Sequence, residues 1–381
     1  EQREGQKTTT GNACGLYFLL GKEVKNDQGV RYREVSQSLI LKEVTVKRIL
    51  LILVTSVILL SIGAGLTYGA PLKIGICKIV EHPALDAVEQ GTIDALSAAG
   101  YEEGVDVEYL LASAQGDLSI AAAIAQNYQV QGVDLVVAIG TAMAQAAAEV
   151  FRGTDTPIVY GAITDPVEAA KLVPSATDPS GNENITGVSD MIPVAAHLRL
   201  LKELSPEIAT IGIVYNPGEP NSAILTEMAL AAAPGIGLSI LTATADSTAN
   251  VSIAAQSLVG RVDAYYVTTD NTVVSAIDSV LAASEEASVP FLMADPTSLP
   301  HATLAAGFDY YSIGLAVGDV VLRILSGTRP DEIPVIYLPE AQVHLNLDAA
   351  EKIGVTFPQS VIEKAASILY GGIVWEREKA E

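Results

Sequence analysis

The fold is decided by the stretch from residue 72 to residue 100, LKIGICKIVEHPALDAVEQGTIDALSAAG. Its first six residues, 72–77, form a largely apolar run that predicts a buried strand. A polar loop follows, and the apolar spacing over residues 84–99 predicts a helix that ends at Gly100. A continuous apolar strand followed by a helix is typical of a parallel sheet covered by helices on both faces.

The same alternation continues beyond this stretch and then starts again. After residue 100, the pattern predicts strands at 105–111, 134–139 and 157–160 and helices at 118–130 and 142–151. A second series predicts strands at 209–215, 238–243, 262–267 and 289–293 and helices at 222–233, 248–259 and 273–287. The chain therefore carries two copies of one α/β plan.

Short matched segments support this repeat. Ile74-Gly75-Ile76 corresponds to Ile211-Gly212-Ile213, and Thr164-Asp165-Pro166 corresponds to Ala294-Asp295-Pro296. The predicted fold class is α/β, with two similar doubly wound parallel-sheet lobes joined by a hinge.

The lobe boundaries follow from the order of the elements. We expect residues 71–187 with 307–331 to form the first lobe and residues 188–306 with 332–370 to form the second. A long helix at 310–325 would return to the first lobe. A strand at 333–338 and helices at 349–354 and 359–369 would return to the second. Residues 371–381, which contain Trp375, are expected to be a frayed tail.

Composition excludes several classes of function. The net charge of −23 argues against a nucleic-acid partner, because phosphate binding needs a basic face. Cys14 and Cys77 are too few for a disulfide framework or a zinc site. The sequence has no nucleophile motif, and Gly-x-Gly-x-x-Gly does not follow the first strand. We therefore expect no metal, no cofactor and no enzymatic activity.

An apolar segment precedes the first lobe. Residues 49–66 carry no charge, Lys47 and Arg48 precede them, and small residues follow up to Ala70. This order is typical of an export signal, so residues 46–70 are predicted to be a signal peptide. A retained membrane anchor is the alternative, since a run of this length can span a bilayer. Residues 1–45 are interpreted as a mis-assigned upstream extension or a disordered tail.

Polar side chains gather where the predicted strands end, which is where parallel α/β sheets bind ligands. The candidate ligand-binding residues are Glu81, His82, Thr141, Ala142, Thr164, Asp165, Asp190, Asn216, Glu219, Asn221, Ser222, Asp270, Asn271 and Asp295. The set is rich in carboxylates and contains no Arg or Lys. Helix capping and turn formation are the alternative roles for these residue types.

This composition favours a zwitterionic amino acid as the ligand. A carboxylate can hold the ammonium group, and we expect Asp270 to do so, with Glu219 as the second candidate. The hydroxyl of Thr141 and nearby helix N-termini can hold the ligand carboxylate. A sugar is disfavoured, because the only Trp is Trp375, far from the strand ends.

Several motifs resemble one known family. They are the strings IVEHPALD at 79–86, AQGD at 114–117, AITDPV at 162–167, TGVSD at 186–190, AQSLV at 255–259, TDNT at 269–272 and GFDYY at 307–311. Over residues 72–360 the chain resembles the substrate-binding proteins of ABC transporters described as tryptophan- or tyrosine-binding. The resemblance implies a type I periplasmic-binding fold and capture of a hydrophobic or aromatic amino acid between the lobes.

Two segments depart from that family's pattern. Gly140-Thr141-Ala142-Met143 stands where Ala-Thr-Pro-Ala is usual, and Tyr160-Gly161 stands where a pair such as Phe-Ser is common. The expected function is an extracytoplasmic receptor, a monomer, that delivers a small molecule to an ABC transporter permease. The rival functions are a membrane-anchored ligand sensor without a transport role and an enzyme on the same scaffold.

Export predicts that the mature protein begins near Gly69, after the apolar segment. N-terminal sequencing of the native protein checks this expectation. Recovery of a soluble cytoplasmic form that keeps residues 1–70 would contradict it.

Overall fold

The computed structural model describes residues 23–25, 31–33 and 70–377. The chain divides into two units, residues 1–67 and residues 68–381. In the first unit, strands β1 (Glu23–Lys25) and β2 (Arg31–Arg33) pair antiparallel. The predicted leader, up to residue 69, and the rest of the extension lie outside the described residues. Among the helices in the described ranges, none combines the length and apolarity needed to cross a bilayer.

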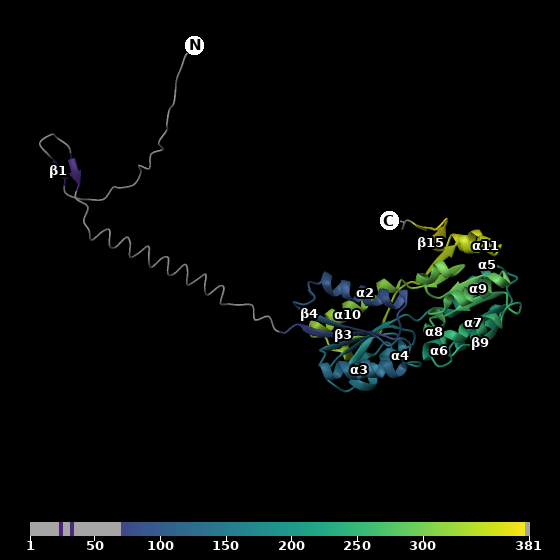
Figure 1. Ribbon diagram of the computed structural model, residues 1–381, viewed down its shortest axis with the longest axis horizontal. Coiled ribbons are helices and arrows are strands. Elements are labelled where there is room, and N and C mark those ends of the chain that lie inside the picture. The colour runs from purple at the N-terminus through teal and green to yellow at the C-terminus, as the bar shows by residue number, and fades with distance from the viewer. Residues whose placement is uncertain (1–22, 26–30, 34–69, 378–381) are drawn as a thin grey trace, which may run out of the picture. The chain divides into compact units, whose positions relative to one another are not determined.

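The first lobe is built on a six-stranded parallel sheet in the order β13-β7-β6-β5-β3-β4. Its strands are β3 (Leu72–Lys78), β4 (Val107–Ser113), β5 (Leu135–Ile139), β6 (Ile158–Ile163), β7 (Ile185–Ser189) and β13 (Ile336–Tyr337). Its helices are α2 (Pro83–Ala98), α3 (Leu118–Gln131), α4 (Thr141–Phe151) and α10 (Tyr310–Leu325). Helices α2 and α10 pack together over one face, and α3 and α4 cover the other (Figure 1).

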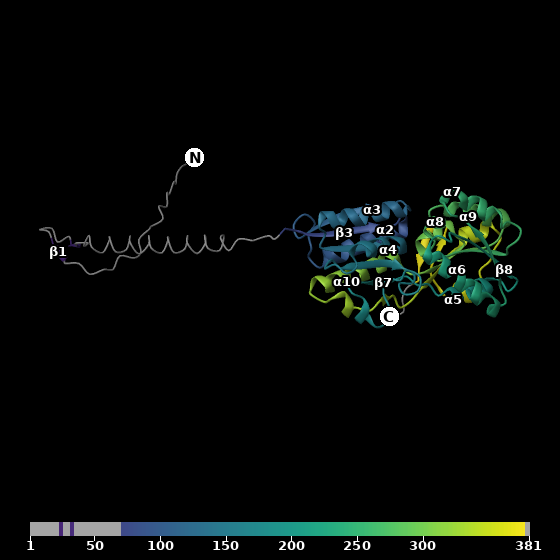
Figure 2. The same ribbon diagram turned by 90° about the horizontal axis from the view of Figure 1, so that it is seen from below.

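The second lobe has an eight-stranded mixed sheet in the order β16-β15-β14-β12-β11-β10-β8-β9. Its strands are β8 (Thr210–Tyr215), β9 (Ser239–Thr244), β10 (Ala264–Val267), β11 (Phe291–Met293), β12 (Leu304–Gly307), β14 (Gln342–Asn346), β15 (Ala365–Tyr370) and β16 (Ile373–Glu376). Its helices are α5 (Val194–Leu204), α6 (Pro220–Ala232), α7 (Thr248–Gln256), α8 (Asn271–Val274), α9 (Ile277–Ala287), α11 (Leu347–Lys352) and α12 (Gln359–Ile362). Helices α7 and α9 lie over one face, and α5 and α6 lie over the other (Figure 2).

Two α/β lobes with parallel sheets confirm the predicted fold class. The sheets pair strands in parallel over the repeat, with β3 between β4 and β5 in one lobe and β8 between β9 and β10 in the other. Only β14 against β12 and β16 against β15 run antiparallel within the second sheet. Both pairs involve strands that follow residue 341, where the chain enters the second lobe for the last time, and these strands are not part of the repeat.

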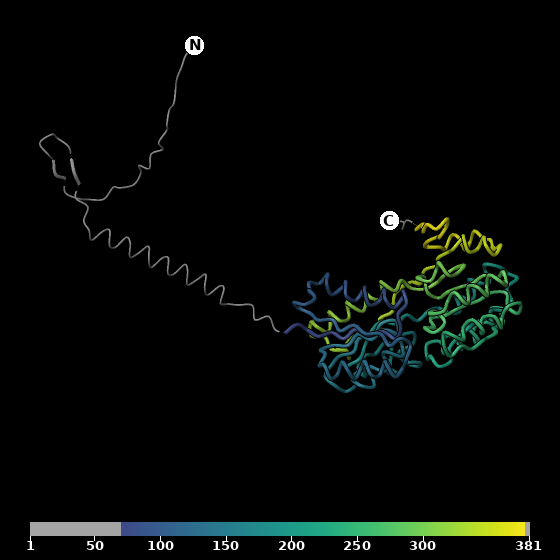
Figure 3. The backbone as a smooth tube through the Cα atoms, viewed as in Figure 1, coloured from purple at the N-terminus to yellow at the C-terminus, as the bar shows by residue number. Residues whose placement is uncertain are grey.

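The order of the elements takes the described backbone between the lobes three times, and Figure 3 shows the tube passing between them. The crossings follow β7, β12 and β13. The strand positions differ from the expected lobe boundaries at two points, because β7 continues to Ser189 in the first sheet and β13 pairs with β7. Residues 336–337 therefore complete the edge of the first sheet, although the sequence boundaries assigned 332–370 to the second lobe.

The C-terminus also differs from its prediction. Residues 359–369 were expected to be one helix and 371–381 a frayed tail, but α12 ends at Ile362 and β15 and β16 form an antiparallel hairpin. Gly371 and Gly372 connect the strands with φ of 62° and 73°. Two successive residues with positive φ give the turn that matches the twist of a two-residue hairpin. The glycine pair therefore ends one strand and starts another.

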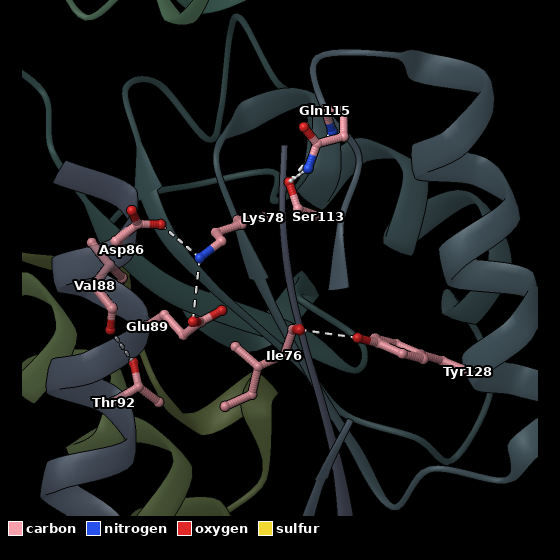
Figure 4. Close-up of polar contacts among 9 residues, drawn as sticks. All are labelled: Ile76, Lys78, Asp86, Val88, Glu89, Thr92, Ser113, Gln115 and Tyr128. Carbon is pink, nitrogen blue, oxygen red and sulfur yellow. Dashed lines mark hydrogen bonds and ion pairs between the residues drawn. The ribbon is translucent and has the colours of Figure 1, made fainter. Parts of the chain in front are cut away.

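Contacts of β3 hold helices on both sides of the first sheet (Figure 4). The Tyr128 ring covers Gly75, where an added Cβ would lie 2.5 Å from the ring, and its hydroxyl donates to the carbonyl of Ile76 at 2.9 Å. On the other face, the Lys78 ammonium contacts Asp86 at 2.6 Å and Glu89 at 3.2 Å, both on α2. The end of β3 is thus held to α2, the helix that begins at the carboxyl edge of the sheet.

Helices α2 and α10 touch backbone to backbone, through glycines. A Cβ added at Gly314 would lie 2.4 Å from the carbonyl oxygen of Val88, and one added at Gly91 would lie 2.4 Å from that of Tyr311. The Thr92 hydroxyl reaches the Gly314 carbonyl at 3.2 Å. Because α10 begins just after the second crossing, this close contact sets where that crossing lies.

Replacing Gly314 by Ala should therefore destabilise the fold. Overpacking of a close contact costs about 1–3 kcal/mol, which outweighs the roughly 1 kcal/mol helix-propensity gain of Ala. Urea denaturation checks the loss. Gly235→Ala is the matched control, because nothing lies within 4 Å of its added Cβ. Equal stability of the two variants would contradict the close packing.

Candidate functional site

A small cavity lies between the lobes, at the carboxyl ends of both sheets. Its volume is about 20 Å³, which matches the room that roughly one water molecule needs. Seven predicted residues line it: His82, Thr141, Thr164, Asp190, Asn221, Asn271 and Asp295. Six further lining residues were not in the predicted set: Ala84, Leu85, Ala162, Thr269, Val274 and Tyr310.

The missed residues are mostly apolar, and a search for polar strand ends does not find them. Ala84 and Leu85 occupy the first turn of α2, directly after the predicted His82 loop. Tyr310 is the first residue of α10 and follows the second crossing. Ala84, Leu85 and Tyr310 share a position, since each lies in the first turn of a helix at the carboxyl edge of a sheet. They give the cavity an apolar wall beside its carboxylates.

The other seven predicted residues do not line the cavity. Glu81 is exposed and Ala142 is half-buried. Asp165 accepts hydrogen bonds from the backbone N–H groups of Val167 and Glu168, both at 2.9 Å. Its carboxylate therefore stabilises the turn that follows β6. The remaining four residues belong to one hydrogen-bond network within the second lobe: Asn216, Glu219, Ser222 and Asp270.

Asp270 is the centre of that network. Its carboxylate accepts the backbone N–H of Val273 at 2.8 Å and that of Asn216 at 2.6 Å, and the Ser222 hydroxyl donates to it at 2.5 Å. Burial, and then the charge of Glu219, raise the pKa of Asp270 to about 7. Asp270 caps α8 and joins three segments, so its carboxylate already accepts three hydrogen bonds from the protein, and its contact with a ligand ammonium group stays a prediction.

The carboxylate of Glu219 is also occupied by hydrogen bonds within the protein. One carboxylate oxygen accepts from the backbone N–H and the side-chain amide of Asn271, at 3.0 and 2.7 Å. The other accepts from the backbone N–H and the hydroxyl of Thr272, at 2.9 and 2.6 Å. Glu219 therefore holds the first turn of α8, and with it the cavity residue Asn271, in a fixed position.

Asp190 differs from these two carboxylates, because it lines the cavity and receives few donors. The Tyr310 hydroxyl donates to one carboxylate oxygen at 2.9 Å, and the Thr164 hydroxyl donates to the other at 3.2 Å. Its side chain is buried, at 3% exposure. Burial raises the pKa of Asp190 to about 6. Within residues 70–377, no Lys or Arg side chain pairs with this carboxylate.

Asp295 is the second cavity carboxylate and comes from the other lobe. It accepts the backbone N–H of Thr297 at 2.8 Å and the hydroxyls of Thr297 and Ser298. Among the residues that the structure describes around the cavity, none is Lys or Arg. Lys78, the cation at the nearby end of β3, is already paired with Asp86 and Glu89 (Figure 4).

Two helices start at the cavity without side-chain caps. Helix α4 begins at Thr141 after Gly140, whose φ is 89°, and α2 begins after His82. Backbone N–H groups in an uncapped first turn favour an anion. Burial lowers the pKa of His82, which keeps its imidazole neutral near pH 7. The first lobe thus presents donors to the same cavity that Asp190 lines.

Two contacts join the lobes across the cavity. A ring nitrogen of His82 lies 3.3 Å from the Asn271 side-chain oxygen, and the hydroxyls of Thr164 and Thr269 lie 3.2 Å apart. All four residues line the cavity. The lobes therefore meet at the site itself, and a larger occupant requires them to separate.

The comparisons with known proteins agree with this architecture. The model of the family ABC transporter substrate binding protein matches residues 73–369. A tyrosine-binding protein of Clostridioides difficile is 34% identical over 282 residues, which are 74% of this chain and 80% of that protein.

Solved structures extend the likeness to three dimensions. A conserved domain protein of Vibrio cholerae has 40% identity and a TM-score of 0.75, and the match covers 78% of this chain and 99% of that one. The ABC domain in complex with L-Trp from Streptococcus pneumonia has 31% identity and a TM-score of 0.74, with coverage of 78% and 100%. The chain belongs to the family of ABC transporter substrate-binding proteins.

Proposed function

We propose that the chain is the extracytoplasmic receptor of an ABC importer and that it captures an amino acid with an apolar or aromatic side chain. The observation that carries the proposal is the buried Asp190 carboxylate, which lines the cavity and accepts side-chain hydrogen bonds from only two of the described residues, both through hydroxyls. A buried charge needs a partner of opposite sign, and a ligand ammonium group supplies one. Asp295 faces the same cavity from the second lobe.

The ligand's carboxylate has a separate place in this arrangement. The uncapped first turns of α2 and α4 offer backbone N–H groups, and Thr141 adds a hydroxyl. Leu85, Val274 and Tyr310 provide apolar surface for a side chain. A zwitterion can place its ammonium group at Asp190 and its carboxylate at the first turns of α2 and α4 at the same time. The tyrosine- and tryptophan-binding relatives support the same class of ligand.

Binding also requires hinge motion. A cavity of about 20 Å³ cannot hold an amino acid, since small-molecule sites have volumes of about 300 Å³ or more. The lobes must open at the His82–Asn271 and Thr164–Thr269 contacts and close around the ligand. The closed form would then present to a membrane permease a surface that the open form lacks. A receptor without catalysis can deliver its ligand for import in this way.

Calorimetry against the twenty amino acids and a panel of common sugars tests the proposal. We expect binding of an apolar or aromatic amino acid and no binding of its decarboxylated amine, which lacks the anion. Tight binding of a sugar, with no binding of any amino acid, would refute the assignment. Turnover of a bound compound would instead favour an enzyme.

Asp190→Asn should weaken amino-acid binding by about 30-fold or more, since losing one partner of a buried charged pair costs roughly 2–5 kcal/mol. In the wild type, affinity should fall by up to about tenfold per pH unit below the Asp190 pKa of about 6. Protonation removes the charge that the ammonium group contacts. Titration calorimetry between pH 5 and 8 measures both effects, and the pH dependence should disappear in the variant.

Asp270→Asn is the matched control for this prediction. Asn keeps only one oxygen, so it can accept from Val273 or from Asn216 and Ser222 but not from all three, and the melting temperature should fall. The affinity should change much less than in Asp190→Asn. The opposite pattern, with affinity lost only in Asp270→Asn, would return the ammonium contact to Asp270.

A further inference from the structure

The C-terminal hairpin of β15 and β16 carries an uncharged surface on a strongly acidic chain. Residues 365–375, AASILYGGIVW, contain no charged side chain, whereas the whole chain has a net charge of −23. Tyr370, Ile373, Val374 and Trp375 are 55%, 58%, 55% and 60% exposed. The family match ends at residue 369, so these four exposed side chains lie beyond the part of the chain that the family describes.

The hairpin is held in place at both ends. Asp348 accepts the backbone N–H groups of Gly371 and Gly372 at the turn, at 2.8 and 3.0 Å. Arg377, after the second strand, donates to the carbonyls of Ile362 and Glu363 at the end of α12. A surface fixed in this way loses little conformational entropy when it binds a partner.

β16 is the last strand of the eight-stranded sheet, and among the described residues no strand pairs with its outer edge. Arg377 donates its N–H to Ala366 at 2.8 Å, and Trp375 lies opposite Ile368. Hydrogen-bonding direction alternates along an antiparallel strand, so Val374 and Glu376 direct their N–H and C=O groups away from β15. An open apolar edge strand is a template for pairing with another strand.

We propose that this edge pairs with β16 of a second copy of the chain, antiparallel and about a two-fold axis. Pairing the outward groups of Val374 with those of Glu376 in the other copy gives four main-chain hydrogen bonds. It places Trp375 opposite its own counterpart, in a non-hydrogen-bonded position with Cα atoms about 4.5 Å apart. A register shifted by one pair toward the C-terminus would place Glu376 against Glu376, which like charge disfavours.

The charge and size of the surface favour a second copy over a membrane. The Asp348 carboxylate sits at the hairpin turn, where insertion into lipid would bury its charge. Two acidic chains can approach most easily where neither carries charge. The four side chains expose roughly 400 Å² per copy, so a dimer buries somewhat less than the ~1,000 Å² of a firm interface before the backbone is counted. The dimer is therefore weak and concentration-dependent.

The test uses residues 68–381, the compact unit, which contains both the family match at 73–369 and the hairpin. Its only Trp is Trp375, so fluorescence reports on the hairpin directly. As the protein concentration rises, sedimentation equilibrium should show the mass doubling, and Trp375 emission should move to shorter wavelength. Ile373→Lys keeps the reporter but places a cation near Arg377 of the other copy, so it should abolish both changes.

Ile253→Lys is the matched control, since Ile253 is 73% exposed on α7 of the same lobe and should leave dimerisation unchanged. Trp375→Cys should form a disulfide-linked dimer under mild oxidation, and Val374→Cys should not, because only position 375 faces itself; Cys77 is buried. A monomeric mass at all concentrations, with no cross-linked dimer of the Trp375→Cys variant, would overturn the proposal. So would a Trp375 emission shift that requires zwitterionic lipid vesicles and is independent of protein concentration.

Discussion

The hydrogen bond between the Tyr310 hydroxyl and the Asp190 carboxylate is the interaction on which the geometry of the cleft depends. Asp190 follows β7, at the first crossing between the lobes, and Tyr310 starts α10 after the second. The bond therefore ties two crossings together at the base of the cavity. It also offsets only part of the unfavourable burial of a charge, because two hydroxyl donors do not replace the hydration of a carboxylate.

The repeat made most of the fold predictable from the sequence. Strands with continuous apolar residues, such as the predicted 72–77 against the observed Leu72–Lys78, are specified by local pattern. The C-terminus was not predictable in the same way. The apolar residues of Ala365–Tyr370 fit a helix or a strand by periodicity alone, and only pairing with β14 and the Gly371-Gly372 turn decide for a strand.

The candidate site was predicted in outline but not in detail. The strand-end rule found most of the polar residues that line the cavity, though not Thr269 or Tyr310, because the carboxyl edge of each sheet is fixed by topology. It could not separate a carboxylate that caps a helix from one that faces the cavity. That difference depends on which backbone N–H groups of a neighbouring loop lie within reach. Glu219 and Asp270 meet those of α8, whereas Asp190 meets only hydroxyls among the described residues.

The same contacts determine how readily the lobes move. The two contacts across the cavity, His82–Asn271 and Thr164–Thr269, join neutral groups, and each such bond contributes about 1 kcal/mol. Shifting a two-state equilibrium from 1:99 to 99:1 takes about 5.5 kcal/mol. Hydrogen bonds to charged groups contribute about 1.5–3 kcal/mol each, so a zwitterion held at both ends can supply that difference. For the same number of bonds per charged group, a ligand with one charged end supplies about half as much, and closure would then favour the zwitterion even where both ligands fit the apolar wall.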